Sequence, residues 1–205
     1  MPKPQKIAAQ PRIDAFVLRI LLLLPFCFGL WFLLSLPLLA PVAWLSDGLL
    51  KLFYPDLIAE VVQQVYTLDV ITRIDSQHID ASNQGLLVLT VNPLLYGYGM
   101  PLLVALMLAG LNPGPLGNLF WVWLCLLLPI QVFGVVMAIL HTLVFEMPVS
   151  VAMQVTDSET GRNILALINQ FSSLILPGLT PFIIWFYLQQ DYLLELIPQL
   201  KRLYS

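Results

Sequence analysis

The chain has 205 residues, of which 59% are hydrophobic and 10% charged, with a formal net charge of −3 and a mean hydropathy of +0.86. So few charges cannot cover the surface of a water-soluble globule, which excludes a soluble enzyme and indicates an integral membrane protein. The lack of a basic excess also argues against nucleic acid as a partner.

Three windows without Asp, Glu, Lys or Arg, at residues 20–46, 81–145 and 163–190, mark the membrane-crossing segments. A charged residue at the centre of a spanning helix costs about 2.5–3.5 kcal/mol, and a crossing needs about 20 apolar residues. The middle window can hold two crossings, separated by the Pro- and Gly-rich turn at residues 111–118. We therefore predict a four-helix transmembrane bundle, with helices at residues 16–39, 94–110, 119–145 and 164–187.

Basic residues flank the first and last helices, and such residues collect on the cytoplasmic side. The N-terminal segment 1–15 and the tail 188–205 are therefore predicted to be cytoplasmic, and segments 40–93 and 146–163 extracytoplasmic. The first apolar window is longer than that of a signal peptide and lacks a cleavage pattern, so we interpret it as a retained anchor. The basic residues assigned to the cytoplasmic side are Lys3, Lys6, Arg12, Arg19, Lys201 and Arg202, against Lys51, Arg73 and Arg162 outside.

The segment 40–93 is predicted to fold as a small α+β unit. Residues 42–54 mix aromatic, apolar and charged side chains, as in an interfacial helix. Residues 57–65 place their apolar side chains on one helical face, which predicts a short amphipathic helix. From Leu68 the pattern alternates with a period of two, so residues 68–75 and 86–91 are expected to pair as a β-hairpin.

An isolated hairpin is only marginally stable, so this hairpin must pack against the amphipathic helix, the membrane surface or another protein. We take its polar face and second strand as the candidate partner surface. A small cap that merely closes the bundle is the alternative interpretation. The surface residues are Asp69, Arg73, Asp75, Leu86 and Val88.

Proline, glycine and tyrosine gather where the second helix begins and again within the fourth helix. Tyrosines suit the membrane interface, glycines permit close helix packing, and prolines remove helical hydrogen bonds. Paired interruptions can also mark a transporter's binding site. The residues of these interruptions are Asn92, Pro93, Tyr96, Tyr98, Pro101, Pro177 and Pro181.

Uncharged polar residues lie within the third and fourth helices: Gln131, Asn169, Gln170 and Ser173. Hydrocarbon offers them no hydrogen-bond partners, so they are expected to bond between helices inside the bundle. A polar seam of this kind is also compatible with a small transporter or channel subunit. Ion and proton pathways, however, usually carry an intramembrane carboxylate or base.

No catalytic or metal-binding pattern emerges, and no cofactor is expected. Cys27 and Cys125 lie in apolar helices, where hydrocarbon disfavours a thiolate, and are interpreted as packing residues. His141 and Glu146 are five positions apart and do not share a helical face. His78 lies in the hairpin loop, and neither histidine has metal-ligand spacing.

Three segments resemble the exosortase H-associated membrane proteins: NPLLYGYGMPLLVALMLAG (residues 92–110), LPIQVFGVVMAILHTLVFE (128–146) and NQFSSLILPGLTPFIIW (169–185). The resemblance implies a bacterial inner-membrane accessory protein that works beside a sorting peptidase or its exported substrates. The catalytic Cys, Arg and His of exosortases have no plausible match here. The resemblance therefore implies a non-catalytic protein whose partner is another membrane or periplasmic protein.

Overall fold

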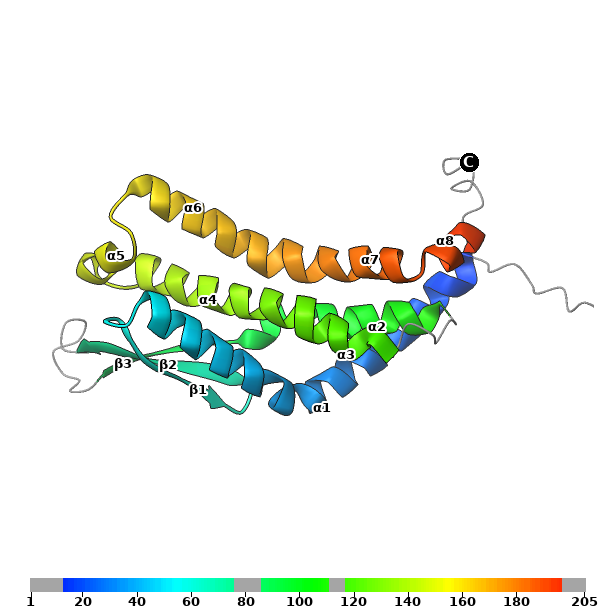
Figure 1. Cartoon of the computed structure of the whole chain (residues 1–205), viewed down its shortest axis with the longest axis horizontal. Helices are drawn as coiled ribbons and strands as arrows, with labels where there is room; N and C mark the ends of the chain where they lie inside the picture. Colours follow the sequence, from blue (N-terminus) through cyan, green and yellow to red (C-terminus); the bar gives the residue numbers. More distant parts are fainter. Residues whose placement is uncertain (1–12, 76–85, 111–116, 197–205) are drawn as a thin grey trace, which may run out of the picture.

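The computed structural model describes residues 13–75, 86–110 and 117–196. Long helices run side by side along the long axis of the molecule, and a small antiparallel sheet packs beside them toward one end (Figure 1). The chain is thus mainly helical, with the sheet inserted between its first two helices.

Helix α1 (Ile13–Phe53) is continuous over 41 residues. It joins the predicted span 16–39 to the interfacial helix expected at 42–54 without a break, and the membrane boundary between them stays a prediction. Pro25, Pro37 and Pro41 lie inside it, and such prolines bend a helix without ending it; α1 bends in its middle (Figure 1). At 1.5 Å per residue α1 is about 61 Å long, twice the thickness of the hydrocarbon core.

The sheet contains β1 (Ile58–Gln64), β2 (Thr67–Asp75) and β3 (Leu86–Val91), in that order. The hairpin predicted for the last two strands is confirmed by the antiparallel pairing of β2 with β3. The amphipathic helix predicted at 57–65 is wrong, because these residues form β1 and pair with β2. The loop between β2 and β3, with His78, lies outside the described residues.

The two-residue turn that joins β1 to β2 has no signal in the sequence, which is why β1 was not predicted as a strand. Gln64 pairs with Thr67, which leaves Val65 and Tyr66 to make the turn. Val65 has a φ of 48°, a left-handed conformation that usually requires glycine or asparagine. The Tyr66 ring stacks on Phe32 of α1 with centroids 4.7 Å apart. Tertiary packing therefore holds a turn that has no local sequence signal.

The predicted second span is divided into a 3-10 turn, η2 (Pro93–Tyr96), and α2 (Gly99–Ala109). The side-chain oxygen of Asn92 caps η2 by accepting a hydrogen bond from the Leu94 amide at 3.0 Å. With 11 residues, α2 is about 17 Å long, too short to cross a bilayer by itself. Within the described residues, three helices are long and apolar enough to cross, and the fourth crossing stays a prediction.

The third span has the predicted bounds and comprises α3 (Leu119–Val122), the π-turn η4 (Trp123–Leu127) and α4 (Leu128–Phe145). The fourth is α6 (Glu159–Gln170), the π-turn η5 (Phe171–Ile175) and α7 (Leu176–Leu188). It begins five residues before the predicted span 164–187.

That early start comes from a helix cap. The Ser158 hydroxyl accepts a hydrogen bond from the Gly161 amide at 3.0 Å, which stabilises a first turn too polar to resemble a membrane span. The loop expected at 146–163 therefore contains α5 (Val149–Val155) and the beginning of α6. A last short helix, α8 (Gln190–Leu196), follows α7.

Two apolar cores hold these elements together. One joins the inner face of the sheet to α4 and the second half of α1. The other joins the start of α1 to α2, α7 and α8, where Phe16 stacks on Trp185 with centroids 5.3 Å apart. The start of α1 and helix α8 therefore lie at one end of the molecule, and the sheet lies toward the other (Figure 1).

Candidate functional site

Gln131 connects α4 to η2 in the interior of the molecule. Its side chain is 7% exposed, and its Nε2 donates a hydrogen bond to the carbonyl of Pro93 at 3.0 Å. A Cβ atom at Gly97 would lie 2.6 Å from the same Nε2, so only glycine permits this approach. The structure thus places Gln131 in an interhelical contact of the kind expected for polar residues in membranes.

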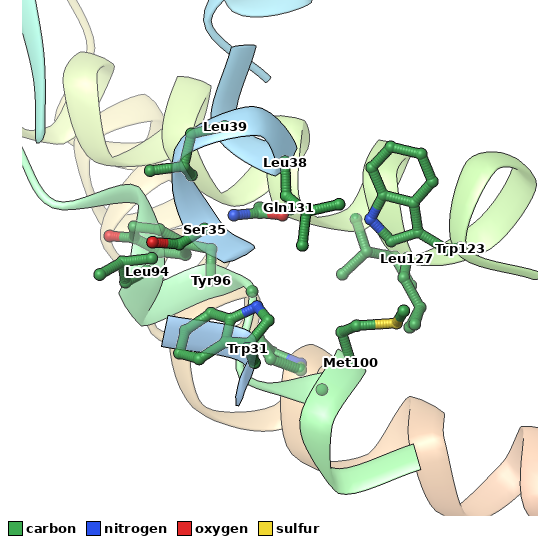
Figure 2. A pocket seen from close by; sticks show the side chains of 14 residues that line it. Trp31, Ser35, Leu38, Leu39, Leu94, Tyr96, Met100, Trp123, Leu127 and Gln131 are labelled. Carbon is green, nitrogen blue, oxygen red and sulfur yellow. The ribbon is translucent and has the colours of Figure 1, made fainter. Parts of the chain in front are cut away.

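A void beside Gln131 is lined by Trp31 and Ser35 of α1, Tyr96 of η2 and Trp123 of η4 (Figure 2). Its volume is about 10 Å³, room for one water molecule. The Ser35 hydroxyl donates to the carbonyl of Phe32 at 2.6 Å. The space is too small for a substrate, so it is a packing feature whose lining is mainly apolar.

The two π-turns have the same cause, a proline that follows each of them in the sequence. In each, an amide donates to the carbonyl five residues earlier, from Leu128 to Trp123 and from Leu176 to Phe171. A proline follows each turn, and its ring would clash with a carbonyl in a regular helix. Both segments, 123–129 and 171–177, read aromatic-x-x-Leu-x-Leu-Pro, a short repeat that the span assignment overlooked.

The predicted interruptions meet where α2 packs on α7. The Tyr98 hydroxyl donates to the carbonyl of Leu174 in η5 at 3.1 Å. A Cβ atom at Gly99 would lie 2.7 Å from the carbonyl oxygen of Pro177, so the two backbones are in close contact. The other proline positions of this set are buried with Tyr96: Pro93, Pro101 and Pro181.

The remaining polar residues of the predicted seam are not gathered around Gln131. Gln170 is exposed. Ser173 donates to the carbonyl of Gln170 at 3.2 Å, within its own helix. Asn169 is half-buried, and its side-chain oxygen has no hydrogen-bond partner. Among these four residues, Gln131 is the one for which the structure shows a side-chain hydrogen bond to a different segment, at the Pro93 carbonyl.

The predicted partner surface lies on one face of the sheet. Leu68, Val70 and Thr72 are buried against the helices, so the intervening residues of β2 point away. On that outer face Asp69 accepts a hydrogen bond from the Thr90 hydroxyl at 2.8 Å, and Arg73 is exposed.

Strand β3 adds apolar side chains to the same outer face. Val88 pairs with Ile71, and Leu86 pairs with Asp75. Val88 is 48% exposed and Leu86 53% exposed. The outer face therefore combines charged side chains from β2 with apolar ones from β3, a mixture found at protein interfaces.

The residues with intrinsic chemical reactivity are dispersed. Cys27 is buried and Cys125 exposed on different helices, and His141 stacks on Phe145 with centroids 4.6 Å apart. Within residues 13–75, 86–110 and 117–196, no group of three or more metal-ligating side chains occurs. The described part of the chain therefore offers packing and contact surfaces, with no assembled metal site.

Comparison with known protein families identifies the family of this chain. The sequence model of the exosortase H-associated membrane protein family matches residues 10–192. The chain belongs to this family. The match covers every helix and strand from α1 to α7, so the sheet and both π-turns lie within the residues that match an exosortase H-associated membrane protein. Neither the curated proteins nor the solved structures provide a match, so the assignment rests on the family alone.

Proposed function

We propose that this exosortase H-associated membrane protein is a non-catalytic accessory subunit of an exosortase-type sorting or export system in the bacterial inner membrane. The observation that carries the proposal is the family match over residues 10–192, because the family's name links it to an exosortase. The dispersed reactive side chains of the described residues fit a role in contact and assembly.

The outer face of the sheet is the surface that we assign to the partner. It presents Asp69 and Arg73 next to exposed Leu86 and Val88, and its inner face is fully used by the protein's own core. Apolar side chains at the centre of a charged surface are the usual anchors of a protein contact. The start of α1 and helix α8, which adjoin the predicted cytoplasmic ends, lie toward the other end of the molecule (Figure 1), so the contact would form outside the cytoplasm.

The transport alternative receives little support from the polar residues. The Gln131 amide is occupied by Pro93, and the adjoining void has a volume of about 10 Å³. A solute path would need polar groups free to bind its cargo along the bundle.

The proposal is tested by co-expressing the tagged protein with an exosortase from the same bacterium and purifying the pair in mild detergent. Val88→Glu introduces a charge at the assigned contact and should reduce the recovered exosortase by about tenfold, a loss of about 1.4 kcal/mol. Val149→Glu is the control, because Val149 is 58% exposed on α5 and does not line the cleft in which Ser150, Val151 and Gln154 of that helix lie beside Arg73.

The control should recover the exosortase as the unmodified protein does. If the unmodified protein recovers no exosortase, the accessory role is wrong. If Val88→Glu recovers as much as Val149→Glu, the role stands but the contact lies elsewhere. Flux of solutes into liposomes that contain this chain alone would support the transport alternative instead.

A further inference from the structure

A stripe of exposed side chains runs along α6 and into η5, formed by Asn163, Leu167, Gln170 and Leu174. These positions follow one another at intervals of four, three and four residues, so they share one helical face. Leu167 is 67% exposed and Leu174 is 71% exposed, whereas Leu165 is buried in the core that includes α4. This α6 stripe therefore faces away from the interior of the protein.

The α6 stripe and the outer face of the sheet lie on different sides of the molecule. Helix α6 runs along one edge, and α4 lies between it and the sheet (Figure 1). The main contacts of α6 are with α4 and η5. A partner bound to the α6 stripe would therefore leave free the face of the sheet that we assign to the exosortase.

The two amides of the α6 stripe, Asn163 and Gln170, differ in their expected depth in the membrane. Within the described residues, neither side chain has a hydrogen-bond partner. The charge-free window of this span begins at residue 163, so we expect Asn163 at the membrane interface and Gln170, about 11 Å farther along the helix, in the hydrocarbon. Lipid chains offer an amide no hydrogen bond, and leaving it unpaired there is unfavourable. Gln170 therefore requires a partner that another polypeptide supplies.

The layout of the α6 stripe favours a second copy of this chain as that partner. Copies of a membrane protein insert in one orientation, so a twofold axis along the membrane normal makes their α6 helices parallel and places each residue of the stripe against its own counterpart. An amide both donates and accepts hydrogen bonds, so Gln170 can pair with itself across the axis. Intervals of three and four residues are those of parallel helix pairs, in which one buried amide fixes the register. A different protein would need amides at matching depths, whereas a second copy has them in its own sequence.

We propose that this protein forms a homodimer in the membrane through the α6 stripe, with the Gln170 side chains of the two copies hydrogen-bonded to each other. Leu167 and Leu174 pack on either side of this pair, and Asn163 forms a second amide pair at the interface. Hydrogen bonds between helices contribute modestly in a membrane, so packing of the two leucines supplies the rest of the attraction. Each copy keeps its sheet free, so the dimer would present two exosortase contacts, a consequence that rests on the proposed function.

Disulfide cross-linking of the full-length protein in its native membrane tests the contact. Cys27 and Cys125 are first replaced by alanine, and Leu167→Cys is compared with Leu33→Cys, a matched control because Leu33 is 71% exposed on α1. Since a disulfide requires closely spaced backbones, Leu167→Cys should give about tenfold more covalent dimer than the control. Equal yields would show random collision, and a cross-link from residue 167 to a different protein would show another occupant of the stripe; either result overturns the proposal.

Gln170→Leu tests the amide pair and separates association from folding, because the Gln170 side chain makes no hydrogen bond within the described part of its own chain. Fluorescence energy transfer between labelled copies in vesicles of phosphatidylethanolamine and phosphatidylglycerol measures the dissociation constant of the dimer. Gln170→Leu should raise this constant about tenfold, whereas Gln170→Asn, which keeps an amide, should retain most of the affinity. The unfolding midpoint of the monomer in detergent should be the same for both variants. An unchanged dissociation constant in Gln170→Leu, or no energy transfer for the unmodified protein, would overturn the proposal.

Discussion

Gln131 is the residue on which the interior of the molecule depends most directly. Its buried amide donates a hydrogen bond to the Pro93 carbonyl at 3.0 Å and so joins α4 to η2. In an apolar interior, an unpaired carbonyl costs more than the hydrogen bond itself contributes. The short turn η2, and with it the path from the sheet into α2, is therefore held by one side chain of α4.

Gln131→Leu should destabilise the protein by about 1–2 kcal/mol, because it removes the buried hydrogen bond between the Gln131 side chain and the Pro93 carbonyl. Thermal unfolding of the purified protein in detergent measures the change. Gln170→Leu is the control, since Gln170 is exposed, and should leave the midpoint almost unchanged. An equal decrease for both substitutions would show that Gln131 has no special structural role.

Gly134 is required for a second close contact at the same level. A Cβ atom there would overlap the Tyr96 ring, so Gly134→Ala should lower stability by about 1–3 kcal/mol through overpacking. Gly29→Ala makes the same change in α1, where nothing lies within 4 Å, and should be neutral or stabilising because alanine favours helix. The thermal unfolding midpoints of the two variants test this prediction. A similar change at both positions would contradict the close packing of η2 on α4.

At the scale of elements, one carboxylate of α1 binds the backbone of β1. Asp47 accepts a hydrogen bond from the Val61 amide at 2.9 Å and also binds Lys51 at 2.8 Å. The turn that joins β1 to β2 has unfavourable geometry at Val65, so this attachment compensates for weak local structure. The sheet keeps its position because α1 extends far enough to support it.

Asp47→Ala should loosen β1, since hydrogen bonds to a charged group contribute about 1.5–3 kcal/mol when well formed. Amide hydrogen exchange at Val61 should become roughly tenfold faster, while exchange in α4 stays the same. Glu60→Ala, which removes an exposed carboxylate from the same strand, should have no such effect. Unchanged exchange at Val61 in Asp47→Ala would show that the strand is stable without this bond.

The charge-free windows predicted the third span closely, because the cost of burying a charge acts on every residue independently of the fold. The hairpin of β2 and β3 was also predicted, from the alternation of Leu68 and Val70 with Asp69. The strand β1 was not, since its turn at Val65 and Tyr66 has no glycine or asparagine and depends on Phe32. At the candidate site, the sequence indicated that Gln131 would lie inside the bundle. It did not indicate which of the other polar residues would lie outside the bundle interior.

At the scale of the whole molecule, α1 is long enough to separate the sheet from the end of the molecule where the start of α1 meets α8. Even if tilted by about 40°, a helix of about 61 Å rises farther than the about 30 Å of hydrocarbon. We therefore expect part of α1 to lie outside the membrane, and the sheet packs on the second half of this helix. The start of α1 and α8 pack together at the other end. We infer that the protein presents the sheet on the side of the membrane opposite its termini.

Cysteine labelling in intact cells tests this arrangement most directly. After Cys27→Ala and Cys125→Ala, single cysteines are introduced by Glu60→Cys on the sheet and Gln190→Cys at the start of α8, both exposed positions. A membrane-impermeant maleimide applied to spheroplasts should label Glu60→Cys at once and Gln190→Cys only after the membrane is opened. Labelling of both positions from the same side would contradict the account, because the sheet would then share a compartment with the chain ends.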